Sequence, residues 1–191
     1  MKVIAFNGSP NKGGNTHRLI QHALDTVERA GIKTELIQIG GKNVHPCTGC
    51  GKCGENQNRQ CVIDNDMVNE CIAKMIEADA IVIGTPTYFA GVTPEIKAFM
   101  DRSFFVAKKN GDLFRHKVGA GIAAERRSGA VCAVDTINHY FGISGMFSAG
   151  SRYWNNAKGL SPGDVEADEE GMDTMQQLGE NIAWFLRKTC G

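Results

Sequence analysis

The feature that most constrains the fold is the regular alternation of short apolar runs with longer amphipathic stretches. Continuous apolar runs at residues 2–6 and 80–84 have the length and composition of strands that are covered on both faces. Between such runs, apolar residues recur every three or four positions, as on one face of a helix. Alternation of this kind builds a parallel sheet with helices on both faces and right-handed crossovers. We therefore expect one doubly wound α/β domain over residues 1–191, with a five-stranded parallel sheet.

The individual elements follow from the same two periods and from the turn residues between them. The expected strands span residues 2–6, 34–39, 80–84, 118–123 and 143–149. Helices are expected over residues 15–30 and 129–141 and, near the C-terminus, around residues 172–186. Two more helices are expected to start after caps at Asp64 or Asn65 and at Thr93. Thr93 before Pro94 is typical of a helix start, because proline at the first helical position needs no N–H partner.

Charge and hydropathy narrow the classes of function. Lys plus Arg number 21 and Asp plus Glu number 21, so the formal net charge is zero. A protein that neutralises nucleic-acid phosphates carries a basic excess, so we expect no nucleic-acid partner. No apolar run approaches the roughly 20 residues that span a bilayer, and the first ten residues turn polar too early for a signal peptide. We therefore expect a cytoplasmic protein without a membrane partner.

The loop after the first strand has the chemistry of an anion site. It runs from Gly8 to Thr16 and combines glycines with short polar side chains. Glycines let the backbone approach a phosphate, and the start of the following helix adds a favourable dipole. The absence of the Gly-Lys-Ser/Thr and G-x-G-x-x-G patterns disfavours an NTPase and a dinucleotide-binding Rossmann protein. The expected phosphate ligands are Ser9, Asn11, Gly13, Gly14, Asn15 and Thr16, and the alternative is a turn that only caps the helix.

Two more loops follow the third and fourth strands, at the sheet edge where such folds bind ligands. Residues 84–94 offer aromatic faces for a planar cofactor, and residues 124–129 contain an arginine pair suited to bidentate phosphate contacts. The alternatives are packing against the next helix for the aromatic rings and a solvated surface for Arg126 and Arg127. The expected cofactor ligands in these loops are Pro86, Thr87, Tyr88, Phe89, Gly91, Ala124, Glu125 and Arg126.

Four of the seven cysteines gather in an insertion over about residues 43–63, after the second strand. Their spacing is C-x2-C-x2-C-x7-C, in which three thiolates wrap one compact group and a fourth returns from the loop. A single [4Fe-4S] cluster fits this spacing, whereas zinc usually takes paired C-x2-C motifs. Zinc and metal-free thiols stay open as alternatives. The expected ligands are Cys47, Cys50, Cys53 and Cys61, and the other cysteines, Cys71, Cys132 and Cys190, are isolated.

These loops resemble those of a known superfamily. The segment VIAFNGSPNKGGNT at residues 3–16 is similar to the phosphate loop of the flavodoxin-like NAD(P)H-dependent FMN reductases. The segment GTPTYFAGVTP at residues 84–94 resembles the loop beneath their flavin ring. The motif CTGCGKC at residues 47–53, followed by Cys61, resembles the compact cysteine motif of the iron-sulfur flavoproteins. The resemblance covers about residues 1–130 and implies a flavodoxin-like fold, bound FMN and a homodimer or homotetramer.

The resemblance implies an FMN-dependent oxidoreductase that takes electrons from NAD(P)H or a redox partner. The electrons would pass, through a [4Fe-4S] cluster if one is bound, to a small-molecule or protein acceptor. No catalytic side chain is expected, because the cofactor supplies the chemistry. The alternatives are an electron carrier without turnover, a quinone or nitro-compound reductase with FMN alone, and a flavin-binding regulatory module. Residues 97–127 hold eight Lys or Arg against three Asp or Glu, a basic stretch that can attract an anionic dinucleotide.

Overall fold

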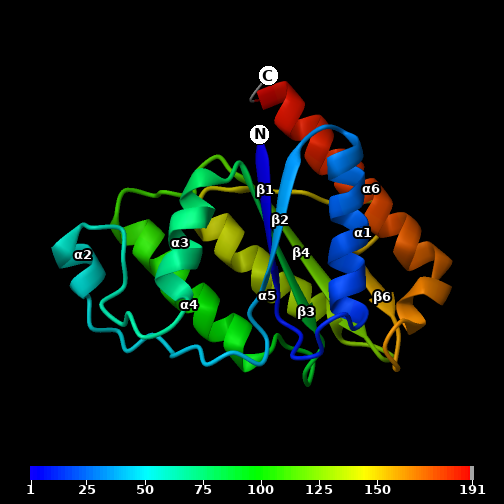
Figure 1. The fold of residues 1–191 in the computed structure, drawn as a ribbon, viewed down its shortest axis with the longest axis horizontal. Coiled ribbons are helices and arrows are strands. Elements are labelled where there is room, and N and C mark those ends of the chain that lie inside the picture. Colours follow the sequence, from blue (N-terminus) through cyan, green and yellow to red (C-terminus); the bar gives the residue numbers. More distant parts are fainter. Residues whose placement is uncertain (190–191) are drawn as a thin grey trace.

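The protein folds around a parallel sheet, shown in Figure 1 as a computed structural model that describes residues 1–189. Cys190 lies outside the described residues. The strands are β1 (Lys2–Asn7), β2 (Lys33–Gln38), β3 (Ala80–Pro86), β4 (Val118–Glu125), β5 (Phe147–Ser148) and β6 (Asn156–Lys158). Five of them lie in the order β2-β1-β3-β4-β5, and β6 also pairs with β4. Each of these pairings is parallel, as the alternation of strands and helices predicts.

Helices cover both faces of the sheet. They are α1 (Asn15–Arg29), α2 (Lys52–Asn56), α3 (Val68–Glu77), α4 (Pro94–Lys109), α5 (Ala130–Ile143), α6 (Glu169–Thr189) and a 3-10 helix, η1 (Asp164–Ala167). Helices α1 and α6 bury their apolar stripes in one core, and α3, α4 and α5 bury theirs in a second core on the opposite face (Figure 1). Among the described helices, none has both the length and the apolar composition to cross a bilayer.

The predicted doubly wound architecture is confirmed, and so is the helix start at Thr93 and Pro94. The last predicted strand, over residues 143–149, is wrong in its bounds. Ile143 still belongs to α5, and Gly145 turns the chain with a φ of 66°, so only Phe147 and Ser148 pair with β4. Strand β6 and the short helix α2 were not predicted, because three residues of β6 and five of α2 show no apolar period.

The outer edge of β4 is shared by two short strands, and this arrangement completes the site. Strand β5 pairs with Val118 and Gly119 at the start of β4, whereas β6 pairs with Ala123 to Glu125 at its end. The chain therefore leaves the sheet after β5 and rejoins it at the carboxyl end of β4. The residues that follow β6 consequently lie at the same sheet edge as the loops after β1 and β3.

Candidate functional site

The phosphate loop (residues 8–16) is braced from below by side chains of the sheet. The Asn7 side chain accepts a hydrogen bond from the Ser9 N–H (3.0 Å) and donates to Gln38 (2.8 Å). Gln38 in turn donates to the carbonyls of Ser9 (2.5 Å) and Gly40 (2.8 Å). A Cβ on Gly40 would lie 2.3 Å from the carbonyl carbon of Ser9, so only glycine allows this approach. The loop therefore has one conformation before any ligand arrives.

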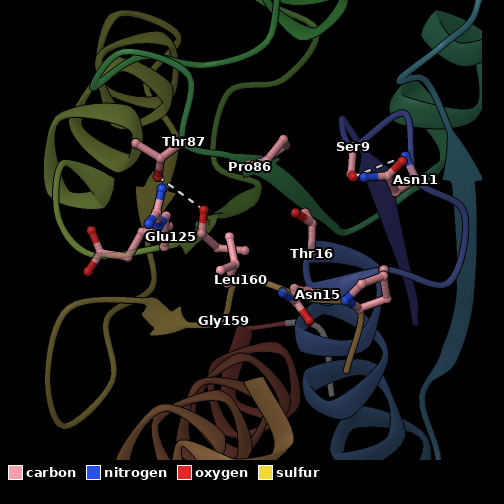
Figure 2. Close-up of a pocket in the computed structure, with 13 residues that line it drawn as sticks. Ser9, Asn11, Asn15, Thr16, Pro86, Thr87, Glu125, Gly159 and Leu160 are labelled. Atoms are coloured by element: carbon pink, nitrogen blue, oxygen red, sulfur yellow. Dashed lines mark hydrogen bonds between the residues drawn. The ribbon is translucent and has the colours of Figure 1, made fainter. Parts of the chain in front are cut away.

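Several donors of this loop stay free to face a ligand. The Ser9 hydroxyl oxygen accepts the Asn11 N–H (3.2 Å), which leaves the hydroxyl proton available (Figure 2). The Asn15 side-chain oxygen accepts the Gly163 N–H (2.8 Å), which orients the amide group of Asn15. Within residues 1–189, no side-chain hydrogen bond caps the start of α1. The first-turn N–H groups and the helix dipole are therefore available to an anion.

These donors line a cavity of about 190 Å³ at the carboxyl ends of β1, β3 and β4. Figure 2 shows Thr16, Pro86 and Leu160 among the side chains that line this cavity. The predicted ligands that the cavity brings together are Ser9, Asn11, Gly14, Asn15, Thr16, Pro86, Thr87, Ala124, Glu125 and Arg126. Gly13, Tyr88, Phe89 and Gly91 do not line it.

Three lining residues escaped the sequence reasoning: Gly159, Leu160 and Pro162, which follow β6. The available signal was the turn-rich segment GLSPG at residues 159–163, since ligand loops in such sheets follow strands. That signal could not be used because β6 itself has no strand pattern. The C-terminal part of the chain therefore supplies one wall of the cavity.

The predicted ring loop after β3 forms a tight hairpin. Tyr88 and Gly91 exchange two backbone hydrogen bonds, of 2.9 and 2.8 Å. The two residues between them, Phe89 and Ala90, have positive φ values of 47° and 61°, a combination that normally selects Asn-Gly. Phe89 is fully exposed, so packing against the next helix does not explain it. A bulky side chain held in a strained turn and facing solvent points to a role in binding.

The loops after β3 and β4 are joined into one wall. The N–H and the hydroxyl of Thr87 both donate to the carbonyl of Ala124, at 2.8 and 3.1 Å. The buried carboxylate of Glu125 accepts the Ala130 N–H (2.9 Å) at the start of α5 and the Asn156 side-chain amide (2.9 Å) of β6. Both oxygens of Glu125 are thus engaged by the protein, and this side chain stabilises the wall.

The four cysteines of the cysteine loop (residues 43–63) line a second, smaller pocket beside α4. Cys47 and Cys50 are exposed, Cys61 is half-buried and Cys53 is buried. Among residues 1–189, no three His, Cys, Asp or Glu side chains meet around one point as the ligands of a single metal ion would. The thiols therefore surround a space, and the exposed pair leaves that space accessible from solvent.

Two of these thiols have shifted pKa values. The Lys52 N–H and the Thr48 hydroxyl donate to Cys50 and lower the pKa of its thiol. Burial raises the pKa of Cys53, although the Gly54 N–H partly offsets this effect. The thiolate, the form that binds metal, therefore forms more readily at Cys50 than at the buried Cys53.

A buried ion pair holds the two ends of the cysteine loop together. The side chains of Arg102 on α4 and Asp66 are inaccessible to solvent and hydrogen-bonded to each other. Arg102 also donates to the carbonyls of His45 (3.3 Å) and Ile63 (2.6 Å), and Asp66 accepts the N–H groups of His45 (3.0 Å) and Val68 (3.1 Å). Burial raises the pKa of Asp66, but the hydrogen bonds from Arg102 and the two N–H groups outweigh it and hold this pKa below its usual value.

Comparison with known proteins agrees with this geometry. Residues 1–160 match the NADPH-dependent FMN reductase family. An iron-sulfur flavoprotein of Methanocaldococcus jannaschii is 38% identical over 194 residues, which cover 98% of each chain. An iron-sulfur flavoprotein of Methanosarcina thermophila is 32% identical over 188 residues, which cover 97% of this chain and 95% of the relative.

The fold is also similar to that of solved flavodoxin structures. A flavodoxin, WrbA-like protein from Agrobacterium tumefaciens aligns with a TM-score of 0.66 at 18% identity, covering 98% of this chain and 97% of that one. An archaeal flavodoxin aligns with a TM-score of 0.64 at 17% identity, covering 98% and 99%. These likenesses show a flavodoxin-like fold. The chain belongs to the NADPH-dependent FMN reductase family.

Proposed function

We propose that the protein is an FMN-dependent oxidoreductase that moves electrons from a reduced nicotinamide to an acceptor. The observation that carries the proposal is the cavity in which the braced anion loop, an uncapped helix start and the joined loops after β3 and β4 meet. FMN, when bound, supplies the redox chemistry by accepting a hydride and releasing the two electrons. The protein contributes binding, orientation and the electrostatic surroundings.

The phosphate is assigned to the phosphate loop. The Ser9 and Thr16 hydroxyls would donate to phosphate oxygens, as would the first-turn N–H groups of α1. Asn15, held in place by Gly163, would add its amide group. Neutral donors and a helix dipole suffice to bind a dianion here, since the loop needs no rearrangement.

The ring is assigned to the outer part of the site. The cavity of about 190 Å³ is smaller than the roughly 300–1,000 Å³ of pockets that hold whole cofactors. A planar ring would therefore extend from Pro86 and Thr87 towards the hairpin, where Tyr88 and Phe89 offer aromatic faces. No side chain acts as a nucleophile in this assignment.

Arg126 and Arg127 are assigned to the nicotinamide dinucleotide. Both are exposed, and Arg126 lines the cavity, so their guanidinium groups would meet phosphates of an incoming donor. Replacing both by Gln should raise the Michaelis constant for NADPH several-fold, measured on protein saturated with FMN. Arg115→Gln, in the exposed loop before β4 at the other sheet edge, is the matched control. An unchanged Michaelis constant in the double variant would overturn this role.

We assign Cys47, Cys50, Cys53 and Cys61, which line the cysteine pocket, as the ligands of a [4Fe-4S] cluster. Four thiols line one pocket, one of them has a lowered pKa, and the exposed pair admits iron and sulfide. The iron-sulfur flavoproteins among the relatives support the same assignment. A cluster, when bound, supplies one-electron transfer, which would divide the electron pair delivered by a nicotinamide.

Anaerobic purification followed by visible spectroscopy and metal analysis tests both cofactors. We expect flavin bands and about four irons with matching sulfide per chain, as a cubane cluster requires. Flavin without iron, or zinc in place of iron, would overturn the cluster and favour the quinone or nitro-compound reductase. A chain that binds no flavin would overturn the proposed function.

Turnover separates the enzyme from the electron carrier and from the regulatory module. We expect steady NADPH oxidation in the presence of an artificial acceptor. Flavin that only a partner protein reduces would favour the carrier, and bound FMN without turnover from any donor would favour the regulatory module. Size-exclusion chromatography of the same sample tests the predicted homodimer or homotetramer.

A further inference from the structure

One nitrogen of Arg102 is buried without a partner. The two terminal nitrogens of its guanidinium group donate to Asp66 and to the carbonyls of His45 and Ile63. The Nε–H is inaccessible to solvent and has no hydrogen-bond acceptor among residues 1–189. A buried N–H on a cation is costly to leave unsatisfied, so its persistence calls for an acceptor that binds there.

The position of this side chain indicates what that acceptor is. Arg102 lines the same pocket as the four cysteines, together with the apolar side chains of Val62, Phe105 and Val106. The pocket therefore pairs sulfur atoms with a guanidinium group in apolar surroundings. In such surroundings a charged hydrogen bond is stronger than in water, and sulfur that carries negative charge accepts it.

We infer that Arg102 is a positioning residue of the cysteine site, which holds both ends of the cysteine loop and donates its Nε–H to sulfur of a bound cluster. This inference rests on the proposed cluster. Arg102 reaches the carbonyl of His45 before Cys47 and the carbonyl of Ile63 after Cys61, so it joins the two chain segments that carry the outer ligands. Closing the loop in advance reduces the entropy lost when the ligands wrap a cluster.

The Nε–H of Arg102 has a second effect, on the reduction potential. A reduced cluster carries one more negative charge than an oxidised one, so its sulfurs accept a hydrogen bond more strongly. Because the Asp66 carboxylate balances the guanidinium charge, the N–H donor at the sulfurs carries the effect and stabilises the reduced form more than the oxidised form. Arg102 should raise the potential of the cluster relative to a protein that lacks it.

Two variants remove the Nε–H in different ways and leave the net charge of the pair unchanged. Arg102→Lys keeps a positive charge but loses the planar fork and the Nε–H. The double variant Arg102→Gln with Asp66→Asn removes both buried charges together, which avoids leaving the Asp66 carboxylate unpaired. Lys109→Gln, an exposed cation on the same helix beside α2, is the matched control. Far-UV circular dichroism and FMN content report whether each variant keeps the fold.

The measurements are an anaerobic redox titration of the cluster and the rate of iron release to a chelator. In the double variant, which removes the Nε–H without changing the net charge of the pair, we expect at least a tenfold weaker preference for the electron, which lowers a one-electron potential by about 59 mV. Both Arg102 variants should release iron several-fold faster than the wild-type protein, and Lys109→Gln should match the wild type. A potential and a release rate unchanged in both variants, or shifted equally in the control, would overturn the inference while leaving the cluster intact. A wild-type chain that holds no cluster after anaerobic reconstitution would instead overturn the proposed cluster, and the inference with it.

Discussion

The phosphate loop and the cysteine loop both follow a strand and carry the groups that would bind a cofactor, yet they are stabilised in different ways. The phosphate loop is fixed by Asn7, Gln38 and the close approach of Gly40, all of which belong to the sheet or its edge. The cysteine loop extends beyond α3 and α4 in Figure 1, and the buried pair of Arg102 and Asp66 holds its ends. One site is therefore held by the sheet, whereas the other is held by side chains around α3 and α4, with the buried ion pair at the ends of the loop.

The largest effect should come from breaking that charge pair. Asp66→Ala leaves Arg102 buried and uncompensated, and we expect a loss of about 3–5 kcal/mol in the free energy of unfolding. Thermal or urea unfolding measures the loss, and a thiol reagent should modify Cys53 faster in the variant. Glu70→Ala, which removes an exposed ion pair with Lys74, is the control and should cost less than about 1 kcal/mol. Similar losses in the two variants would contradict the role of the buried pair.

The second effect concerns a ligand contact of the phosphate loop. Ser9→Ala removes a hydroxyl donor and the bond that its oxygen accepts from the Asn11 N–H, but it keeps the Asn7 bond, which goes to the backbone N–H of position 9. Hydrogen bonds to charged groups contribute about 1.5–3 kcal/mol, so FMN should bind roughly 10- to 150-fold more weakly. Fluorescence titration of FMN into the apoprotein measures this affinity, with the exposed Ser128→Ala as the control. An unchanged affinity would remove Ser9 from the phosphate site.

A smaller effect is expected when a side chain is added at Gly40, where the backbone approaches the phosphate loop closely. Gly40→Ala places a Cβ 2.3 Å from the Ser9 backbone, and we expect about 1–3 kcal/mol of lost stability together with weaker FMN binding. Gly150→Ala adds a Cβ in open space and should change neither quantity by more than about 0.5 kcal/mol. Lost stability with normal FMN affinity would show that the phosphate loop adapts, which would weaken the contrast between the two loops.

The smallest effect lies in the hairpin at the rim of the cavity. Ala90→Gly suits the positive φ of 61° at that position, so we expect a gain of about 0.5–1 kcal/mol in unfolding free energy. FMN affinity should change little, because the variant keeps the aromatic side chains of Tyr88 and Phe89 that are assigned to the ring. Differential scanning calorimetry and the same fluorescence titration measure both quantities. A destabilised variant would show that the hairpin is not strained.

The features that the sequence predicts are those with a local signal. Strand β3 has a continuous apolar run, and the phosphate loop has its glycines and polar residues within nine positions. Strand β6 has the residues Asn-Ala-Lys and is a strand because the end of β4 has an edge to pair with. The pairing of Arg102 with Asp66 joins residues 36 positions apart and has no local pattern. Sequence reasoning therefore found most lining residues of the cavity, but not the wall after β6 or the buried pair.

The hydrogen bond between Asn15 and Gly163 sets an order of events during synthesis. Its two residues are 148 positions apart, so the wall that closes the cavity leaves the ribosome long after the phosphate loop. At the usual rate of about 5–20 residues per second, this delay is roughly 7–30 s. In that interval the nascent chain has its anion loop but no complete cavity. A complete cavity therefore exists only once the wall after β6 has been synthesised.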